Sequence, residues 1–201
     1  MKLCVIVPIA VAPFLATMAV AQARPVRIRG EIVAVKGDHL TIKTRAGRTI
    51  KLDLAKGYAV GTVAKASLAD IKPNDYVGTA AIPQSNGMLK ALEVHIFPPA
   101  KRGVGEGFHA WDLAPHSSMT NAPVTGIVKS AHGSVLTLTY HGGRKKVLVS
   151  PGTPIVRDEK GSPADVKPGV GVLAFAAKKT GSDDYAAGRI VVGQDGVNPP
   201  Q

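Results

Sequence analysis

Apolar and polar positions alternate along several short runs of the chain, and this alternation predicts β-strands. In the first half the runs are VRIRGEIVAV, HLTIKT and TIKLDL, and turn-forming residues at 36–38 and 46–47 separate them. In the second half VLTLTY and KKVLV repeat the pattern around the glycines at 142–143. Because short strands joined by tight turns are typical of β-hairpins, the sequence predicts an all-β protein.

One phrase occurs twice in the chain. SLADIKPNDYVGTAA begins at Ser67, and SPADVKPGVGVLAFA begins at Ser162. In both copies an aspartate follows three residues after the serine, an arrangement that caps and starts a short helical turn. A proline then ends the turn, because proline cannot continue a helix, and an apolar run restarts a strand.

The repetition extends on both sides of this phrase. GEIVAVKGDHLTIKTRAGR from Gly30 parallels GIVKSAHGSVLTLTYHGGR from Gly126, and ALEVHI from Ala91 parallels AGRIVV from Ala187. Similarity at a fixed spacing over this length indicates a tandem duplication.

Each repeat has the order three strands, one short helical turn and two strands, which is also the order of the five-stranded OB barrel. We therefore predict two tandem, small, five- to six-stranded OB-like barrels joined by a non-repeated linker. The first barrel spans 24–98, the linker 99–122 and the second barrel 123–193, with a tail at 194–201. In this prediction the repeated phrase crosses each barrel between its third and fourth strands. A sixth strand in YAVGTVA, an SH3-like barrel or two flat sheets would give a similar pattern.

The first residues, 1–23, have the layout of a secretory signal peptide. A positive start is followed by an apolar run from Leu3 to Val20 and by small residues up to Ala23. A transmembrane anchor is the alternative, but two prolines interrupt the run, and it barely reaches the length that spans a bilayer. We predict cleavage near Ala23 and export to the periplasm or the medium. Cys4, the one cysteine, lies in this segment, so we expect neither disulfides nor thiol chemistry in the mature chain.

The chain is strongly basic, with 25 Lys and Arg against 14 Asp and Glu and a formal net charge of +11. A basic exported protein meets anionic envelope components such as lipopolysaccharide and acidic lipid head groups, and its charge speeds such encounters. The alternative is that these charges only keep hairpin faces soluble, since they recur in turns and at strand edges. After 1–23 no apolar run has the length of a membrane span, so we expect no transmembrane segment after cleavage.

The runs KASLADIKPNDYVGTAAIPQ, LKALEVHIFP and GEGFHAWDLAPHSSMTNA resemble a group of uncharacterised exported proteins of Gram-negative bacteria. The group carries a duplicated barrel-like domain of unknown function and is often given the name metal ABC transporter permease. The resemblance covers nearly the whole mature chain, but it implies no catalytic or binding residues. A permease crosses the membrane several times, and we expect no spanning segment in the mature chain, so the name does not fit. A soluble accessory to transport stays open.

The segment 97–123 is the one part that the duplication does not repeat, and unique loops often hold function. It contains the only tryptophan, Trp111, which we expect to pack with Phe108 and Leu113 at the junction of the barrels. It also holds a set of side chains with nitrogen, oxygen and thioether donors that suit copper or zinc, namely Glu106, His109, Asp112, His116 and Met119. Their spacing looks helical, but three preceding glycines and an internal proline argue against one continuous helix, so no cofactor is expected and copper or zinc remains the alternative.

Other kinds of chemistry have weaker support. His116 and Asp112 near Ser117 contain the residue types of a hydrolase, but no nucleophile elbow surrounds the serine. His95 and His132 are interpreted as packing or turn residues. Nucleic acid is an improbable partner, because the exposed aromatic residues that stack on bases are scarce.

We therefore expect a non-enzymatic binding or scaffolding protein of the periplasm, with an anionic envelope component or a protein as its partner. The alternative function is a soluble copper- or zinc-binding accessory protein that uses the central linker. The sequence does not specify the ligand, the pathway or the oligomeric state.

Overall fold

The computed structural model describes residues 26–199, and the predicted signal peptide therefore lies outside the described residues. The described chain is all-β: it contains twelve strands, three short 3₁₀ turns and no α-helix. The 3₁₀ turns are η1 (Leu68–Asp70), η2 (Pro99–Lys101) and η3 (Pro163–Asp165). The strands are β1 (Val26–Lys36), β2 (His39–Thr44), β3 (Thr49–Ala66), β4 (Tyr76–Pro83), β5 (Leu89–Ile96), β6 (Gly107–Ala110), β7 (Ser118–Ser130), β8 (Gly133–Tyr140), β9 (Gly143–Val149), β10 (Ile155–Lys160), β11 (Gly171–Lys179) and β12 (Asp184–Gly193).

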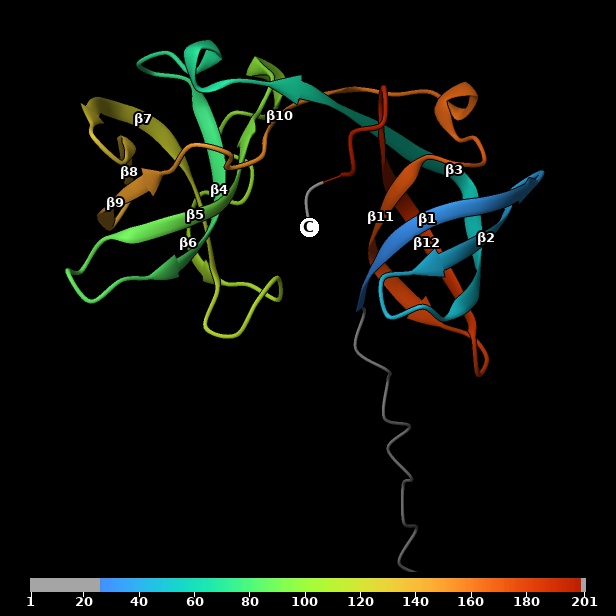
Figure 1. The fold of residues 1–201 in the computed structure, drawn as a ribbon. Coiled ribbons are helices and arrows are strands. Elements are labelled where there is room, and N and C mark those ends of the chain that lie inside the picture. The colour runs from blue at the N-terminus through green and yellow to red at the C-terminus, as the bar shows by residue number, and fades with distance from the viewer. Residues whose placement is uncertain (1–25, 200–201) are drawn as a thin grey trace, which may run out of the picture.

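All twelve strands belong to one large sheet, which folds into the two lobes visible in Figure 1. In one lobe β1, β2, β3, β12 and β11 are hydrogen-bonded in that order, and β11 pairs with β1 to close a ring. In the other lobe β7, β8, β9, β5 and β4 are bonded in the corresponding order, and β4 pairs with β7. We call these closed sets the first ring and the second ring.

The composition of the rings corrects the predicted domain boundaries. The sequence predicts that 24–98 and 123–193 each form one barrel, but each ring combines three strands of one repeat with two strands of the other. In the first ring β1, β2 and β3 are completed by β11 and β12, which come from the second repeat. In the second ring β7, β8 and β9 are completed by β4 and β5 of the first repeat. The two repeats have therefore exchanged their last two strands within one chain.

The repeated phrase marks the place where the chain passes from one ring to the other. The Asp70 carboxylate accepts hydrogen bonds from the Ser67 backbone N–H at 2.8 Å and from the Ser67 hydroxyl at 2.7 Å. Asp165 makes the same two bonds with Ser162, at 2.7 and 2.9 Å. The predicted capped turns are therefore confirmed, but they connect two rings instead of crossing one.

A second connection joins the rings through the sheet itself. β10 pairs antiparallel with the end of β3, from Gly61 to Ala66, and it pairs parallel with β5. The predicted sixth strand in YAVGTVA forms, but as part of the long strand β3. Figure 1 shows β3 and β10 running between the two lobes.

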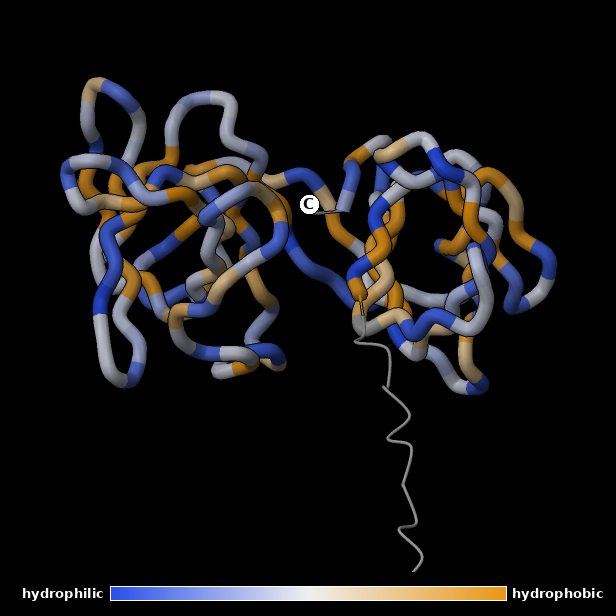
Figure 2. The backbone as a smooth tube through the Cα atoms, turned by 90° about the horizontal axis from the view of Figure 1, so that it is seen from below, coloured by the Kyte–Doolittle hydropathy of each residue, from blue (hydrophilic) through white to orange (hydrophobic). Residues whose placement is uncertain are grey.

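Each ring encloses its own apolar core, and Figure 2 shows hydrophobic and hydrophilic positions alternating along both lobes. The core of the first ring includes Ile32, Ile42 and Ile190, and that of the second includes Leu136 and Leu138. The alternation predicts these inward positions correctly, because successive side chains of a strand point to opposite faces. Within 26–199 no helix has the length and apolar character needed to cross a membrane.

Candidate functional site

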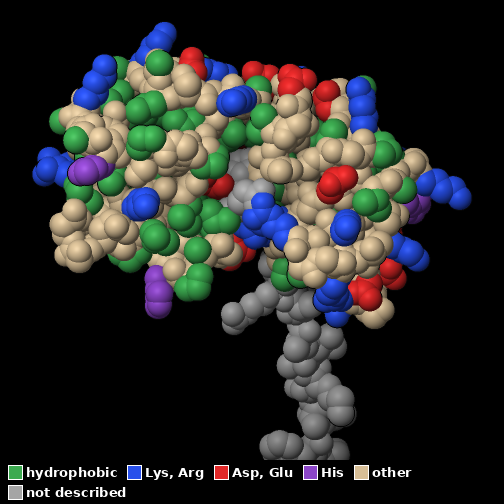
Figure 3. Space-filling view, viewed as in Figure 1, with side chains coloured by type: hydrophobic (Ala, Val, Ile, Leu, Met, Phe, Trp, Pro, Cys, Tyr) green, Lys and Arg blue, Asp and Glu red, His purple; other side chains and the backbone are tan. Residues whose placement is uncertain are grey.

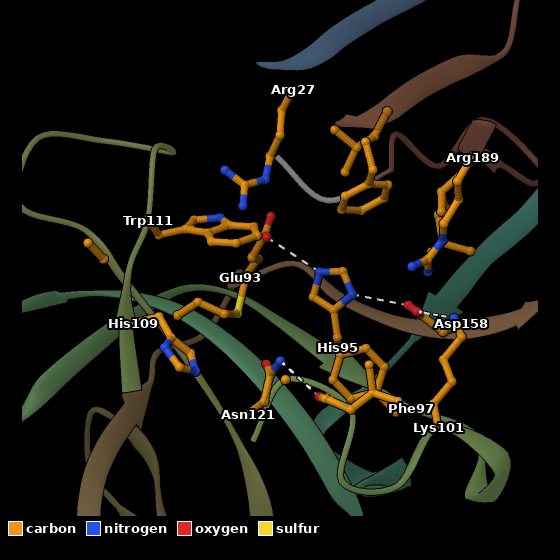
Figure 4. A pocket seen from close by; sticks show the side chains of 18 residues that line it. Arg27, Glu93, His95, Phe97, Lys101, His109, Trp111, Asn121, Asp158 and Arg189 are labelled. Carbon is orange, nitrogen blue, oxygen red and sulfur yellow. Dashed lines mark hydrogen bonds and ion pairs between the residues drawn. The ribbon is translucent and has the colours of Figure 1, made fainter. Parts of the chain in front are cut away.

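A cavity of about 360 Å³ lies where the two rings meet. Its walls come from β1, β3, β11 and β12 of the first ring, from β5 and β7 of the second, and from β10 and the segment between the repeats. This volume is within the range of small-molecule sites. Because the exchange of strands creates this junction, the cavity depends on both repeats (Figure 4).

A buried charged network forms one side of the cavity. His95 of β5 lies between two carboxylates, with Nδ1 3.0 Å from Asp158 Oδ1 and Nε2 3.4 Å from Glu93 Oε1. The Lys101 ammonium donates to the second oxygen of Asp158 at 2.9 Å. Glu93, His95 and Asp158 are 4, 9 and 6 % exposed, so all three charges are held away from bulk water. Buried charges persist only when they are paired, and here the pairs extend across β5, β10 and η2.

The network shifts the pKa values of His95 and Asp158 in the directions that favour their charged forms. Burial alone would lower the pKa of His95, but the hydrogen bonds and charges of Asp158 and Glu93 outweigh it and raise the pKa to about 9. Burial alone would raise the pKa of Asp158, but His95 and Lys101 lower it. At neutral pH His95 is therefore an imidazolium that is paired with the ionised Asp158.

Arginines stacked on aromatic rings form another part of the wall. The Arg27 guanidinium of β1 lies 3.9 Å from the centroid of the Trp111 ring, and Arg189 of β12 lies 4.9 Å from that of Phe175. Asp112, next to Trp111, accepts ion pairs from Arg27 at 3.1 Å and Arg29 at 2.6 Å. The segment between the repeats is thus tied to the first ring, although its strand β6 pairs with β7 of the second.

Equivalent positions of the two repeats meet in the cavity with different chemistry. Alignment of ALEVHI with AGRIVV makes Glu93 equivalent to Arg189 and His95 equivalent to Val191. Val63 and Asp158 are also equivalent, because each is the fourth residue before the serine that begins the repeated phrase in its own repeat. The first repeat contributes Val63, Glu93 and His95, whereas the second contributes Asp158, Arg189 and Val191, and all six line the cavity. The cavity therefore combines acidic, hydrogen-bonded groups with apolar residues and an arginine.

Two polar atoms of the wall lack a partner within the described part of the chain. They are the Trp111 indole nitrogen Nε1, a donor, and the Asn121 side-chain oxygen Oδ1, an acceptor. Both are buried, and both residues line the cavity. Because an unpaired buried polar group is costly, these two atoms lower the stability of the cavity wall.

The five predicted metal ligands are dispersed. His109 and Met119 face each other across β6 and β7 and both line the cavity. Asp112 is held by arginines, and the Glu106 carboxylate accepts a hydrogen bond from the His141 backbone N–H at 2.9 Å. His116 is exposed in a turn with a positive φ of 60°. Among residues 26–199 no group of three or more His, Cys, Asp and Glu side chains is placed to hold a metal ion.

The tryptophan and the histidines singled out in the sequence lie partly where they were expected and partly elsewhere. Trp111 lies at the junction of the rings and is half-buried, as expected in position, but Phe108 is 42 % exposed and stacks under Lys145. His132 is an exposed turn residue. His95, interpreted as a packing or turn residue, is instead the centre of the charged network. The signal that could have identified it is a charged or polar residue in one repeat where the other repeat has valine.

Comparison of the chain with protein-family models, with curated proteins and with solved structures finds no match. The resemblance to exported Gram-negative proteins therefore stays a prediction.

Proposed function

We propose that the protein is a non-enzymatic binding protein of the periplasm and that it binds an organic anion with a flat apolar body in the cavity between the rings. This ligand has the chemistry expected of an anionic envelope component or a fragment of one. The observation that carries the proposal is the mixed lining of the cavity, in which apolar and aromatic walls adjoin arginines and buried hydrogen-bonding groups. Ligand sites are typically apolar cavities with a few convergent polar groups.

The architecture supports this role. We propose that each ring is an OB-like barrel, since three consecutive strands, a capped turn and two strands make up each set, although the two strands come from the other repeat. Two barrels whose repeats exchange strands are tied together and hold their common cavity in a fixed shape, and a preformed site loses less entropy on binding.

The distribution of charge favours a defined cavity over a general anionic surface. On the face in Figure 3, Lys and Arg side chains are spread over both lobes and interspersed with acidic residues. Dispersed charges of this kind speed the approach of an anion but do not specify it. The arginines stacked in the cavity, by contrast, are held in place by Trp111 and Phe175.

The alternative metal-binding role has less support from the side chains. Asp112 and Glu106 already accept bonds from arginines and from backbone, and His116 points from a separate turn. A metal ion would have to compete with these contacts for its oxygen ligands.

The test uses 8-anilinonaphthalene-1-sulfonate, a monoanion with a large aromatic body, in equilibrium dialysis with the full chain. We expect one molecule to bind per chain, and Ala110→Trp, which adds a large side chain to the cavity wall, should abolish the binding. The matched control is Ala131→Trp, in an exposed turn, which should bind as the original does. Absence of binding, or binding that Ala110→Trp does not reduce, would overturn the proposal.

A further inference from the structure

Arg189 stands out among the cations of the cavity by its lack of an acidic partner. Lys101 is paired with Asp158, and Arg27 is paired with Asp112. Within the described part of the chain Arg189 makes no ion pair, and its contact is the stacking on Phe175. Stacking holds the guanidinium plane in one orientation and leaves its N–H donors available.

The surroundings of Arg189 strengthen its attraction for an anion. The neighbouring wall is made by Val63, Leu173 and Val191, which are almost fully buried and offer no competing hydrogen bonds. Arg189 itself is exposed, but an anion that it binds against these apolar walls is screened less than one in open water. A carboxylate can also accept two parallel bonds from a guanidinium, which fixes its position.

The other charged groups of the cavity disfavour a second negative charge. Glu93 and Asp158 present carboxylates within hydrogen-bond distance of His95, and Asp158 pairs in register with Val63, in the wall next to Arg189. Because His95, Lys101 and Arg27 already have acidic partners, a second anionic group of the ligand would meet carboxylates without a free cation, and like charges in a partly buried site repel. The neutral end of a ligand, by contrast, can meet the apolar and aromatic surface.

We propose that the cavity selects a monocarboxylate: the ligand has one carboxylate, which Arg189 binds, and a flat apolar body that lies along the cavity toward Trp111. This inference rests on the proposed function and adds the charge of the ligand and the residue that recognises it. Figure 4 shows Arg27 and Arg189 reaching into the cavity from different strands, with His95 between them and Trp111 beside Arg27.

The experiment compares three molecules with the same ring system, 2-naphthamide, 2-naphthoate and naphthalene-2,6-dicarboxylate, by equilibrium dialysis with the full chain. We expect 2-naphthoate to bind about tenfold more tightly than either of the others, because only it gains the ion pair without the repulsion. Arg189→Gln should weaken 2-naphthoate to the level of the amide and leave the amide unchanged. Arg144→Gln removes the same charge from an exposed site on β9, outside the cavity, and should change nothing.

The possible results separate this inference from the proposed function. If none of the three molecules binds, and the sulfonate does not bind either, the cavity is not a site for flat anions and both proposals fall. If the amide and the monocarboxylate bind equally and Ala110→Trp blocks both, the cavity is a site but Arg189 does not select charge. Two results would show that the overall basic charge of the protein determines binding: tighter binding of the dicarboxylate, or an equal loss of affinity for 2-naphthoate in Arg189→Gln and Arg144→Gln. Either result would overturn the proposal that the cavity selects a monocarboxylate.

Discussion

Val63 of β3 and Asp158 of β10 are paired with each other across two antiparallel strands, and they are also equivalent positions of the two repeats. Each is the fourth residue before the serine that begins the repeated phrase. A pairing of equivalent residues places a local pseudo-twofold axis between them. The exchange of strands follows this symmetry, since each repeat passes β4 and β5, or β11 and β12, to the ring of the other.

The exchange of strands predicts which pair of introduced cysteines can form a disulfide. Thr79 of β4 faces Thr120 of β7, whereas two separate barrels would place Thr79 beside the strand that contains Ile28. In a chain with Cys4→Ser, which then has no other thiol, the pair Thr79→Cys and Thr120→Cys should form a disulfide within one chain under mild oxidation. The pair Thr79→Cys and Ile28→Cys should not. Mass spectrometry after proteolysis identifies the link, and the opposite result would mean that each repeat forms its own barrel.

The sequence predicts the strands well because alternation depends on which face of a strand is buried, a local property. It does not identify partners: β4 can complete a ring with β1 or with β7 while its inward side chains remain inward. The capped turn at Ser67 has the same sequence in both arrangements, so the path of the chain after it cannot be predicted from the pattern. The sequence does not predict the cavity for the same reason, since Glu93 and Arg189 line one cavity only when the repeats exchange strands.

Where the chain crosses between the rings, one residue of each repeat contributes to stability through its backbone conformation more than through side-chain contacts. Gly169 has a positive φ of 85°, and its equivalent Asn74 has a φ of 71°. Gly169→Ala should lower the free energy of unfolding by about 1 kcal/mol, because a Cβ disfavours this left-handed conformation even where there is room for it. Gly188→Ala is the matched control: there is equal room on β12 without a positive φ, so the change should stay within about 0.5 kcal/mol. If urea unfolding shows that Gly169→Ala and Gly188→Ala lose the same free energy of unfolding, this explanation is wrong.

Trp111 is the only tryptophan and reports on the contact between the linking segment and the first ring. Its emission should be blue-shifted and partly shielded from iodide, because the ring is half-buried beneath Arg27. Arg27→Gln removes the stacking and one ion pair to Asp112, so the emission should move to the red and iodide quenching should increase. Lys36→Gln, an exposed change on the same strand, should leave both unchanged. Trp111→Ala should cost about 2 kcal/mol, less than for a fully buried ring.

The charged network predicts how stability depends on pH. The pKa of His95 is raised from 6.5 to about 9 in the folded protein, chiefly because the hydrogen bonds and charges of Asp158 and Glu93 outweigh its burial. Its contribution is therefore fully present below pH 6.5 and is lost as the pH rises through 9, by about 3 kcal/mol. The pKa of Asp158 is lowered, so its own contribution is present at neutral pH and disappears only in acid. Urea unfolding of the original chain between pH 6 and pH 10 should show this loss.

His95→Gln is the decisive variant for this dependence, because it removes the titrating group and leaves a side chain that can still bond to a carboxylate. Between pH 6.5 and 9 its stability curve should be nearly flat, although it lies below the original at neutral pH, where Asp158 and Glu93 have lost the charge between them. His132→Gln removes an exposed histidine and should retain the original slope. If His95→Gln does not fold, the slope of the original chain alone decides. A flat curve there would mean that His95 is neutral in the folded protein, and that the two carboxylates are stabilised by Lys101 and by hydrogen bonds instead.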